Sequence, residues 1–270
     1  MAEPLSSARQ AYLRRLGREK RRVTLAQILL LLGFFALWEL AARAGWIDSF
    51  LLSSPSRIWE TLAGLWTSGD LWLHLGTSCW ETVAGFMLGT AVGAVIAVLL
   101  WLCPGLYRVV EPYLVVLSAL PKTALGPVFI VWIGAGPASI IAMTLAISLI
   151  VTILEVHNGF LATDPGKLRL MRTMGASRSQ ILWKLVLPAN FGTFINALKV
   201  NVGLSWVGVI MGEFLVSRAG LGYLIVYGSQ VFQMDLVMAS VLLLAVVAAV
   251  MYQGIRLLER SVHHHREGST

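Results

Sequence analysis

Long apolar runs alternate with short polar segments along most of the chain. Six runs contain about 20 residues or more, the length that a helix needs to cross a hydrocarbon layer of ~30 Å. They lie near residues 24–44, 77–103, 109–133, 138–157, 193–215 and 236–257. The pattern predicts an all-α integral membrane protein with six transmembrane helices.

Composition supports a membrane environment. Hydrophobic residues make up 57% of the 270 residues, charged residues make up 13%, and the mean hydropathy is +0.75. A soluble domain contains about 45–50% apolar and about 25% charged residues. The net charge of +7 could indicate a nucleic-acid partner. However, the cations cluster beside apolar runs, which favours a role in membrane orientation.

The charge distribution divides the chain into a basic tail (1–23), a membrane domain (24–257) and a C-terminal tail (258–270). The start of the chain also resembles a signal peptide, because Ala42-Arg43-Ala44 follows a basic stretch and an apolar run. That run is long, and more strongly apolar runs follow it. We therefore expect an uncleaved first transmembrane helix.

Lys and Arg residues alternate in density between successive connections. They are frequent in the N-terminal tail, in the 158–190 connection and near the C-terminus, and sparse in 45–76, 134–137 and 216–235. Cytoplasmic segments carry the excess of these cations. We expect both termini in the cytoplasm and 158–190 as the largest cytoplasmic loop. The tryptophan-rich segment 46–76 should form an interfacial loop with one short helix on the other side.

The basic loop contains the stretch MRTMGASRSQILWKLVLP at residues 171–188. Its apolar residues have helical spacing, interrupted near Gly175-Ala176. This pattern predicts two short helices joined at a bend, with small residues at the bend that let another surface approach closely. Leu187-Pro188 should then break the helix before the fifth span, because proline removes a backbone donor.

Several stretches resemble one protein family. Gly175-Ala176 followed by Leu185-x-Leu187-Pro188 is similar to the cytoplasmic loop of permeases in ATP-driven, binding-protein-dependent importers. Residues 71–89, 117–136 and 212–225 resemble the nitrate/sulfonate/taurine branch of these permeases, and the likeness covers roughly residues 50–258. It implies the fold of a type I ABC importer permease, with cytoplasmic coupling helices, in the bacterial inner membrane.

The resemblance also implies partners. They are ABC ATPase subunits that hold ATP and Mg, an extracytoplasmic substrate-binding protein and a second copy of this chain, with no cofactor in the chain itself. It places an outer mouth at Gly220, Leu221 and Gly222, although by composition these residues are only a turn. It assigns contact with the ATPase to the loop residues Arg169, Arg172, Gly175, Ala176, Ser177, Leu185, Leu187 and Pro188.

One position departs from the family pattern. The family's loop usually opens Glu-Ala-Ala, whereas this chain has Arg169, Leu170 and Met171 there. The exchange of an acid for a cation suggests a compensating acidic residue on the chain's own ATPase. On this hypothesis Arg169→Glu should weaken assembly with the native ATPase, and unchanged assembly would contradict it.

Catalytic and metal-ligand patterns are missing from the sequence. It has no paired carboxylates, Ser/His/Asp set or Cys/His cluster at catalytic spacing, and no phosphate-binding G-x-x-x-x-G-K-S/T loop. His263 to His265 are expected to form a solvated tail. An alternative function is a secondary transporter or channel without an ATPase partner, but the carboxylate deep in a span and the inverted repeat that it predicts are not evident.

Charges inside apolar runs are candidate path residues, because they are costly in a membrane. Lys122 lies between Pro121 and Pro127 near the middle of the third run, where it could line a path for a small anion such as nitrate, a sulfonate or taurine. Alternatively, Lys122 pairs with a glutamate or faces a wet vestibule. The path candidates are thus Pro121, Lys122 and Pro127, together with Glu213 near the outer end of the fifth run. For Glu213 the alternative is an ion pair with Arg218.

Small residues repeat at four-residue spacing in two runs. Gly85, Gly89 and Gly93 lie in the second run, and Gly208 and Gly212 lie in the fifth. Such stripes let helices approach closely, either between two subunits of a homodimer or within one subunit. The two cysteines, Cys79 and Cys103, are too far apart along one helix to form a disulfide.

Overall fold

The computed structural model describes residues 7–267, with side chains for Arg15 and residues 17–260. These residues are mostly helical. In chain order the elements are α1 (Ser7–Arg43), α2 (Ser49–Leu52), α3 (Pro55–Ser68), α4 (Asp70–Leu102), α5 (Pro104–Ala119), a 3-10 turn (Lys122–Leu125), α6 (Gly126–Ile133), α7 (Pro137–Leu161), α8 (Pro165–Thr173), α9 (Arg178–Ile181), a π-helical turn (Leu182–Val186), α10 (Leu187–Ala189), α11 (Phe191–Val216), α12 (Leu221–Gln230) and α13 (Met234–Glu267).

Within residues 7–267, five helices are long and apolar enough to cross a membrane: α1, α4, α7, α11 and α13. A sixth span exists if α5 and the segment through α6 are taken together, but these two parts meet at an angle of 92°. The span expected over 109–133 is therefore broken into two parts rather than one continuous helix. The helix ends where Leu120 and Pro121 adopt extended backbone, and Pro127 occupies the first turn of α6.

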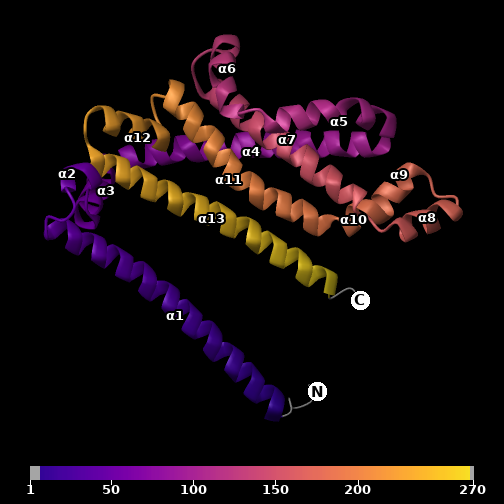
Figure 1. The fold of residues 1–270 in the computed structure, drawn as a ribbon, viewed down its shortest axis with the longest axis horizontal. Coiled ribbons are helices and arrows are strands. Elements are labelled where there is room, and N and C mark those ends of the chain that lie inside the picture. Colours follow the sequence, from indigo (N-terminus) through magenta and orange to yellow (C-terminus); the bar gives the residue numbers. More distant parts are fainter. Residues whose placement is uncertain (1–6, 268–270) are drawn as a thin grey trace.

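The core of the bundle is formed by α4, α7 and α11, which lie side by side in Figure 1. Gly89 of α4 lies so close to Ser148 and the Leu145 carbonyl of α7 that an added Cβ would collide with them. Gly85 and Gly93 face Thr144 and Thr152 in the same way. The glycine stripe thus packs within one subunit, which was one of the two predicted roles.

On the other side of the core, α13 packs against α11, α12 and α3. An ion pair joins α3 to the start of α13, with 2.7 Å between Arg57 Nη2 and Asp235 Oδ2. In contrast, α1 runs apart from the bundle in Figure 1, and only 6% of its spanning window is buried. It is attached through Glu39, whose carboxylate accepts a hydrogen bond from the Ser56 amide (3.1 Å).

The segment 46–76 contains more helix than the single short one predicted. Asp48 caps α2, Ser54 caps α3, and Gly69 takes a left-handed φ of 85° between α3 and α4. Because α4 already begins at Asp70, the second span starts earlier than expected. The cysteines at 79 and 103 are free, as predicted.

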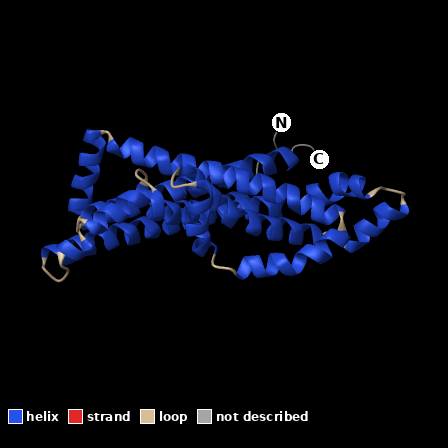
Figure 2. Cartoon of the chain, turned by 90° about the horizontal axis from the view of Figure 1, so that it is seen from above, coloured by secondary structure: helices blue, strands red, loops and turns tan. Residues whose placement is uncertain are grey.

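The two ends of the described chain share one side of the molecule. The N-terminal end of α1 and the C-terminal end of α13 point toward the end of the bundle that carries α8 and α9 (Figures 1 and 2). The segment 7–23 is part of α1 rather than a separate tail. Residues 1–6 and 268–270, and the side chains of His263 to His265, lie outside the description.

Candidate functional site

Two short helices, α8 and α9, form the connection between α7 and α11. α8 begins where the Asp164 carboxylate accepts a hydrogen bond from the Gly166 amide (2.7 Å). α9 begins with a capping box, in which the Ser177 amide donates to Gln180 Oε1 (2.8 Å) and the Gln180 amide donates to Ser177 Oγ (3.3 Å). Between the helices Gly175 adopts φ of 78°. The bend lies where the sequence predicts it.

The bend presents apolar side chains to the surface. Met174 is 75% exposed and Leu170 is 61% exposed, and a Cβ added at Gly175 would meet no atom within 4 Å. On the opposite face Met171 and Ala176 pack against a buried cluster that includes residues of α7, α9 and the π-helical turn. The bend is therefore held by the core on one side and free to contact a partner on the other.

The eight predicted loop residues divide between these two faces. Leu185 and Leu187 are half-buried and pack against the same cluster as Ala176. The remaining predicted residues are exposed: Arg169, Arg172, Gly175, Ser177 and Pro188.

The predicted break before the fifth span lies two residues after Pro188, where α10 ends at Ala189 and Asn190 (φ −101°, ψ 14°) separates it from α11. Residues 182–186 form a π-helical turn, in which the Leu187 amide donates to the Leu182 carbonyl five residues earlier. Pro188 lies in α10, which follows this turn directly, and it has no amide to donate to the preceding helical turn. The π-helical turn thus leads directly into α10, and the helical path is interrupted only after it, at Asn190.

The predicted path residues Pro121, Lys122 and Pro127 lie at or beside the break between α5 and α6. Lys122 is half-buried, and its Nζ donates a hydrogen bond to the Ser118 carbonyl (3.0 Å). Within the described part of the chain no carboxylate lies within 4 Å of it, so the alternative of an ion pair with a glutamate does not hold. Lys199, another intramembrane cation, pairs with Glu259 instead (2.7 Å).

Glu213 lies in a buried polar cluster between α4, α11 and α12. Its carboxylate accepts hydrogen bonds of 2.5 Å from Ser78 Oγ and from the Gly222 amide. The Ser78 hydroxyl in turn accepts from the Leu221 amide (2.7 Å), and His74 Nδ1 accepts from the Gly220 amide (3.0 Å). The cluster thereby satisfies three backbone amides at the start of α12.

This geometry corrects two predictions. Gly220, Leu221 and Gly222 are buried and begin α12, so they are not a simple exposed turn. Glu213 is 2% exposed and is satisfied by α12, and among the described residues no ion pair joins it to Arg218. Its place in a translocation path stays a prediction.

His74, Ser78 and Glu81 belong to this part of α4 but were not predicted as site residues. With Thr82 these residues recur at helical spacing along α4 within an otherwise apolar run, a signal that identifies a buried polar stripe. Glu81 is 1% exposed, and neither of its carboxylate oxygens has a hydrogen-bond partner in the described structure.

The bend, the glycine stripe and Glu213 of the polar cluster lie within one region of the chain that matches a known family. A family model described as a binding-protein-dependent transport system inner membrane component matches residues 85–264. The chain belongs to this family. The likeness inferred from its residue motifs is therefore confirmed.

Among permeases of this family, the chain is similar to several with named transport systems. A protein named for aliphatic sulfonate transport, SsuC of Bacillus subtilis, is 28% identical over 243 residues, which cover 90% of this chain and 88% of SsuC. The taurine transport system permease protein TauC of Escherichia coli is 24% identical over 245 residues, which cover 89% of both chains. The formylaminopyrimidine transport permease protein ThiX of Halalkalibacterium halodurans is 28% identical over 195 residues, which cover 72% of this chain and 77% of ThiX.

Solved structures share the fold. A chain of the inward-facing MetNI methionine ABC transporter has a TM-score of 0.62 at 21% identity, covering 77% of this chain and 99% of that chain. A chain of a bacterial ABC transporter for alginate import has a TM-score of 0.63 at 14% identity, covering 92% and 99%. The protein is thus a multi-pass inner-membrane permease subunit with the type I ABC importer fold, a transport component rather than an enzyme.

Proposed function

We propose that this permease couples to a separate ATPase subunit through the surface formed by Leu170, Met174 and Gly175. The observation that carries the proposal is the exposure of two large apolar side chains beside an open glycine on a basic loop. Exposed apolar groups at a polar end of a membrane protein are typical of a protein contact. The rigid attachment of the other face to the core would transmit a movement of the loop to α7 and α11.

In the assembly that we propose, two copies of the permease form the path at or near a two-fold axis. Two ATPase subunits lie beneath, and an extracytoplasmic binding protein delivers the solute from above. ATP and Mg are bound by the ATPase. Closure of the ATPase pair draws the α8–α9 segments together, so that the spans change from an inward-open to an outward-open state. Hydrolysis then resets the cycle.

The proposed solute is a small anion of the sulfonate, taurine or nitrate kind. Two relatives named for sulfonate or taurine transport support this class. Lys122 supports it independently, because it is a half-buried cation without a described carboxylate partner, beside a break in the third span. A cation at such a position favours anions by direct electrostatic attraction.

The coupling surface is tested by Gly175→Asp in a permease co-purified with its ATPase from the native membrane. A charged side chain at the centre of the apolar bend should weaken assembly or uncouple ATP hydrolysis from transport. The measurement is the permease-to-ATPase ratio together with ATPase activity. Gly45→Asp is the matched control, because Gly45 also has a positive φ (72°) and open space around it but lies at the other end of the first span.

Loss of assembly or coupling in Gly175→Asp alone supports the proposal. Equal behaviour of the two variants would contradict it. A wild-type permease that purifies from mild detergent without any ATPase would instead favour a secondary transporter or channel.

The anion path is tested by Lys122→Gln, with Lys122→Arg as a charge-preserving control. We expect the neutral variant to lose about tenfold or more in solute uptake, because one buried charge–charge interaction contributes a few kcal/mol. The arginine variant should retain most of the uptake. Unchanged uptake and unchanged solute-stimulated ATPase activity in Lys122→Gln would remove Lys122 from the path.

A further inference from the structure

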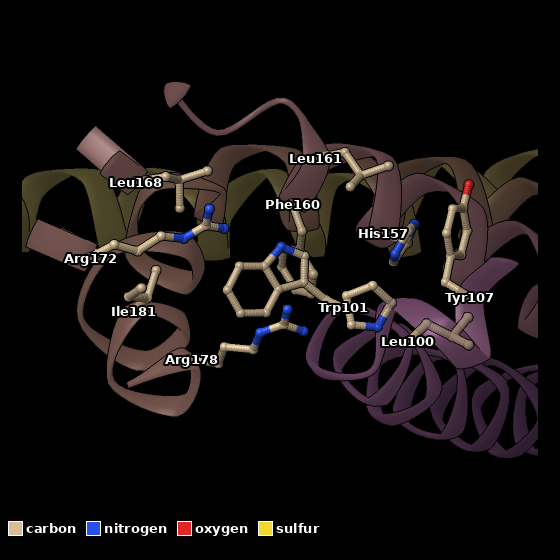
Figure 3. Close-up of a pocket in the computed structure, with 11 residues that line it drawn as sticks. Leu100, Trp101, Tyr107, His157, Phe160, Leu161, Leu168, Arg172, Arg178 and Ile181 are labelled. Carbon is tan, nitrogen blue, oxygen red and sulfur yellow. The ribbon is translucent and has the colours of Figure 1, made fainter. Parts of the chain in front are cut away.

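A pocket of about 200 Å³ lies where α4, α5 and α7 meet the α8–α9 segment. Leu100 and Trp101 from the end of α4 and Phe160 from the end of α7 form apolar walls (Figure 3). Because these residues lie at the ends of spanning helices, the pocket lies at the depth of the lipid headgroups, whichever side of the membrane it faces.

Three basic side chains line this pocket. In Figure 3 the guanidinium groups of Arg172 and Arg178 lie on either side of the Trp101 indole, and His157 lies toward the far end beside Tyr107. Arg178 Nη1 donates one hydrogen bond to the Leu102 carbonyl (3.1 Å), which fixes the position of that side chain.

The two guanidinium charges of the pocket have no carboxylate partner in the described chain, since none lies within 4 Å of Arg172 or Arg178. His157 is 3% exposed and stacks on Tyr107 with 4.1 Å between ring centroids, yet its ring nitrogens have no described hydrogen-bond partner. At the other end of the pocket, Glu111 accepts a hydrogen bond from the hydroxyl of Tyr107 (3.0 Å). Its negative charge would repel an anion there, so an anion is expected at the end that carries the two arginines.

We propose that this pocket binds a phosphate-bearing anion between Arg172 and Arg178. Guanidinium groups match the geometry of phosphate oxygens and bind them through bidentate hydrogen bonds. The volume is smaller than the roughly 300–1,000 Å³ of sites for drug-sized ligands, so it suits one headgroup rather than a large solute. The apolar walls suit the glycerol and upper acyl part of an anionic phospholipid, and basic pockets between membrane helices bind such headgroups.

The test measures thermal stabilisation of the full-length protein, purified in a neutral detergent, by short-chain lipids. The probes are dioctanoyl phosphatidylglycerol, dioctanoyl phosphatidylcholine and glycerol 3-phosphate. We expect phosphatidylglycerol to bind the wild type about tenfold more tightly than phosphatidylcholine, because it carries a net charge. Arg172→Gln should weaken phosphatidylglycerol binding about tenfold, and Arg172→Lys should weaken it less.

Arg108→Gln is the matched control. Arg108 is an exposed arginine on α5, next to Tyr107 in the chain, and does not line the pocket. Leu168→Trp is a second test variant, which fills the pocket and keeps every charge; it should also abolish phosphatidylglycerol binding. The melting temperature of each variant without lipid shows whether it is folded.

The outcomes separate the two sources of phosphate. Tight binding of phosphatidylglycerol with weak binding of glycerol 3-phosphate supports a lipid site, and equally tight binding of both supports a site for a soluble phosphate ester. Equal binding of phosphatidylglycerol and phosphatidylcholine would overturn the proposal. So would an Arg108→Gln variant that loses as much affinity as Arg172→Gln, or a Leu168→Trp variant that keeps full affinity. None of these results depends on the transport cycle or on an ATPase.

Discussion

Glu213 shows how one side chain can organise the end of a membrane bundle. A carboxylate at 2% exposure would be costly in an apolar interior unless hydrogen bonds compensate it. Here it accepts hydrogen bonds from Ser78 of α4 and from the Gly222 amide of α12, so a single residue of α11 connects three helices. Gly220 and Gly222 are required beside it, since an added Cβ at either position would collide with the carboxylate.

Replacing Glu213 should therefore destabilise the protein in proportion to the acceptors lost. Glu213→Ala leaves the Ser78 hydroxyl and the Gly222 amide without an acceptor, which should lower the free energy of unfolding by roughly 2–5 kcal/mol. Glu213→Gln keeps one acceptor oxygen and should cost less. The measurement is denaturant unfolding in detergent, followed by the helical signal.

Glu155→Ala is the control for removing a carboxylate, because Glu155 is exposed on α7 and has no described hydrogen-bond or ion-pair partner. It should leave the free energy of unfolding nearly unchanged. If Glu213→Ala behaved like Glu155→Ala, the polar cluster would not stabilise α12.

At the scale of whole helices, the closest contact joins α4 and α7. The hydroxyls of Thr144, Ser148 and Thr152 donate to carbonyls four residues earlier in α7, so they need no partner on α4. The Asn201 side chain of α11 donates a further hydrogen bond to Thr152. The two backbones can approach closely because hydroxyl side chains face glycines.

This packing predicts a large difference between two glycines of α4. Gly89→Val should lower the free energy of unfolding by several kcal/mol, because its added Cβ would overlap Ser148 and the Leu145 carbonyl. Gly76→Val is the matched control on the same helix, since no atom lies within 4 Å of its added Cβ. Thermal unfolding in detergent measures both, and equal shifts of Tm would contradict the close α4–α7 contact.

The sequence predicted the long helices because their apolar runs are set by the thickness of the membrane, as in α4 and α7. It also located the bend at Gly175, where local turn chemistry decides the backbone. It did not predict the 92° break after α5 or the burial of Gly220 and Gly222. Those features depend on contacts between residues distant in the chain, such as Glu213 with Ser78, which no local pattern encodes.

At the scale of the molecule, the basic segments lie toward one end. The end of α13 and the start of α1 run toward the side that carries the α8–α9 loop, although the start of α1 stands apart from the bundle (Figure 1). Because cytoplasmic segments carry the excess of Lys and Arg, this arrangement predicts that the end with the α8–α9 loop lies inside the cell. Cys103, exposed at the end of α4, provides a native probe of the orientation.

A membrane-impermeant maleimide should label Cys103 in inside-out vesicles and leave it unlabelled in right-side-out vesicles. For the opposite end, Trp46→Cys in a Cys103→Ser background should give the reverse pattern, because Trp46 is 85% exposed beyond the first span. The readout is the mass of the labelled protein. Reversal of both patterns would place the α8–α9 loop outside the cell.

The interlocked contact between α4 and α7 has a mechanical consequence. Two helices whose backbones approach over Gly85, Gly89 and Gly93 cannot slide past each other without forcing side chains into backbone. Any change of shape would thus move α4 and α7 as one rigid body. The rotation would be concentrated at the extended backbone of Leu120 and Pro121, where the side-chain hydrogen bond from Lys122 to the Ser118 carbonyl crosses a segment that is not helical.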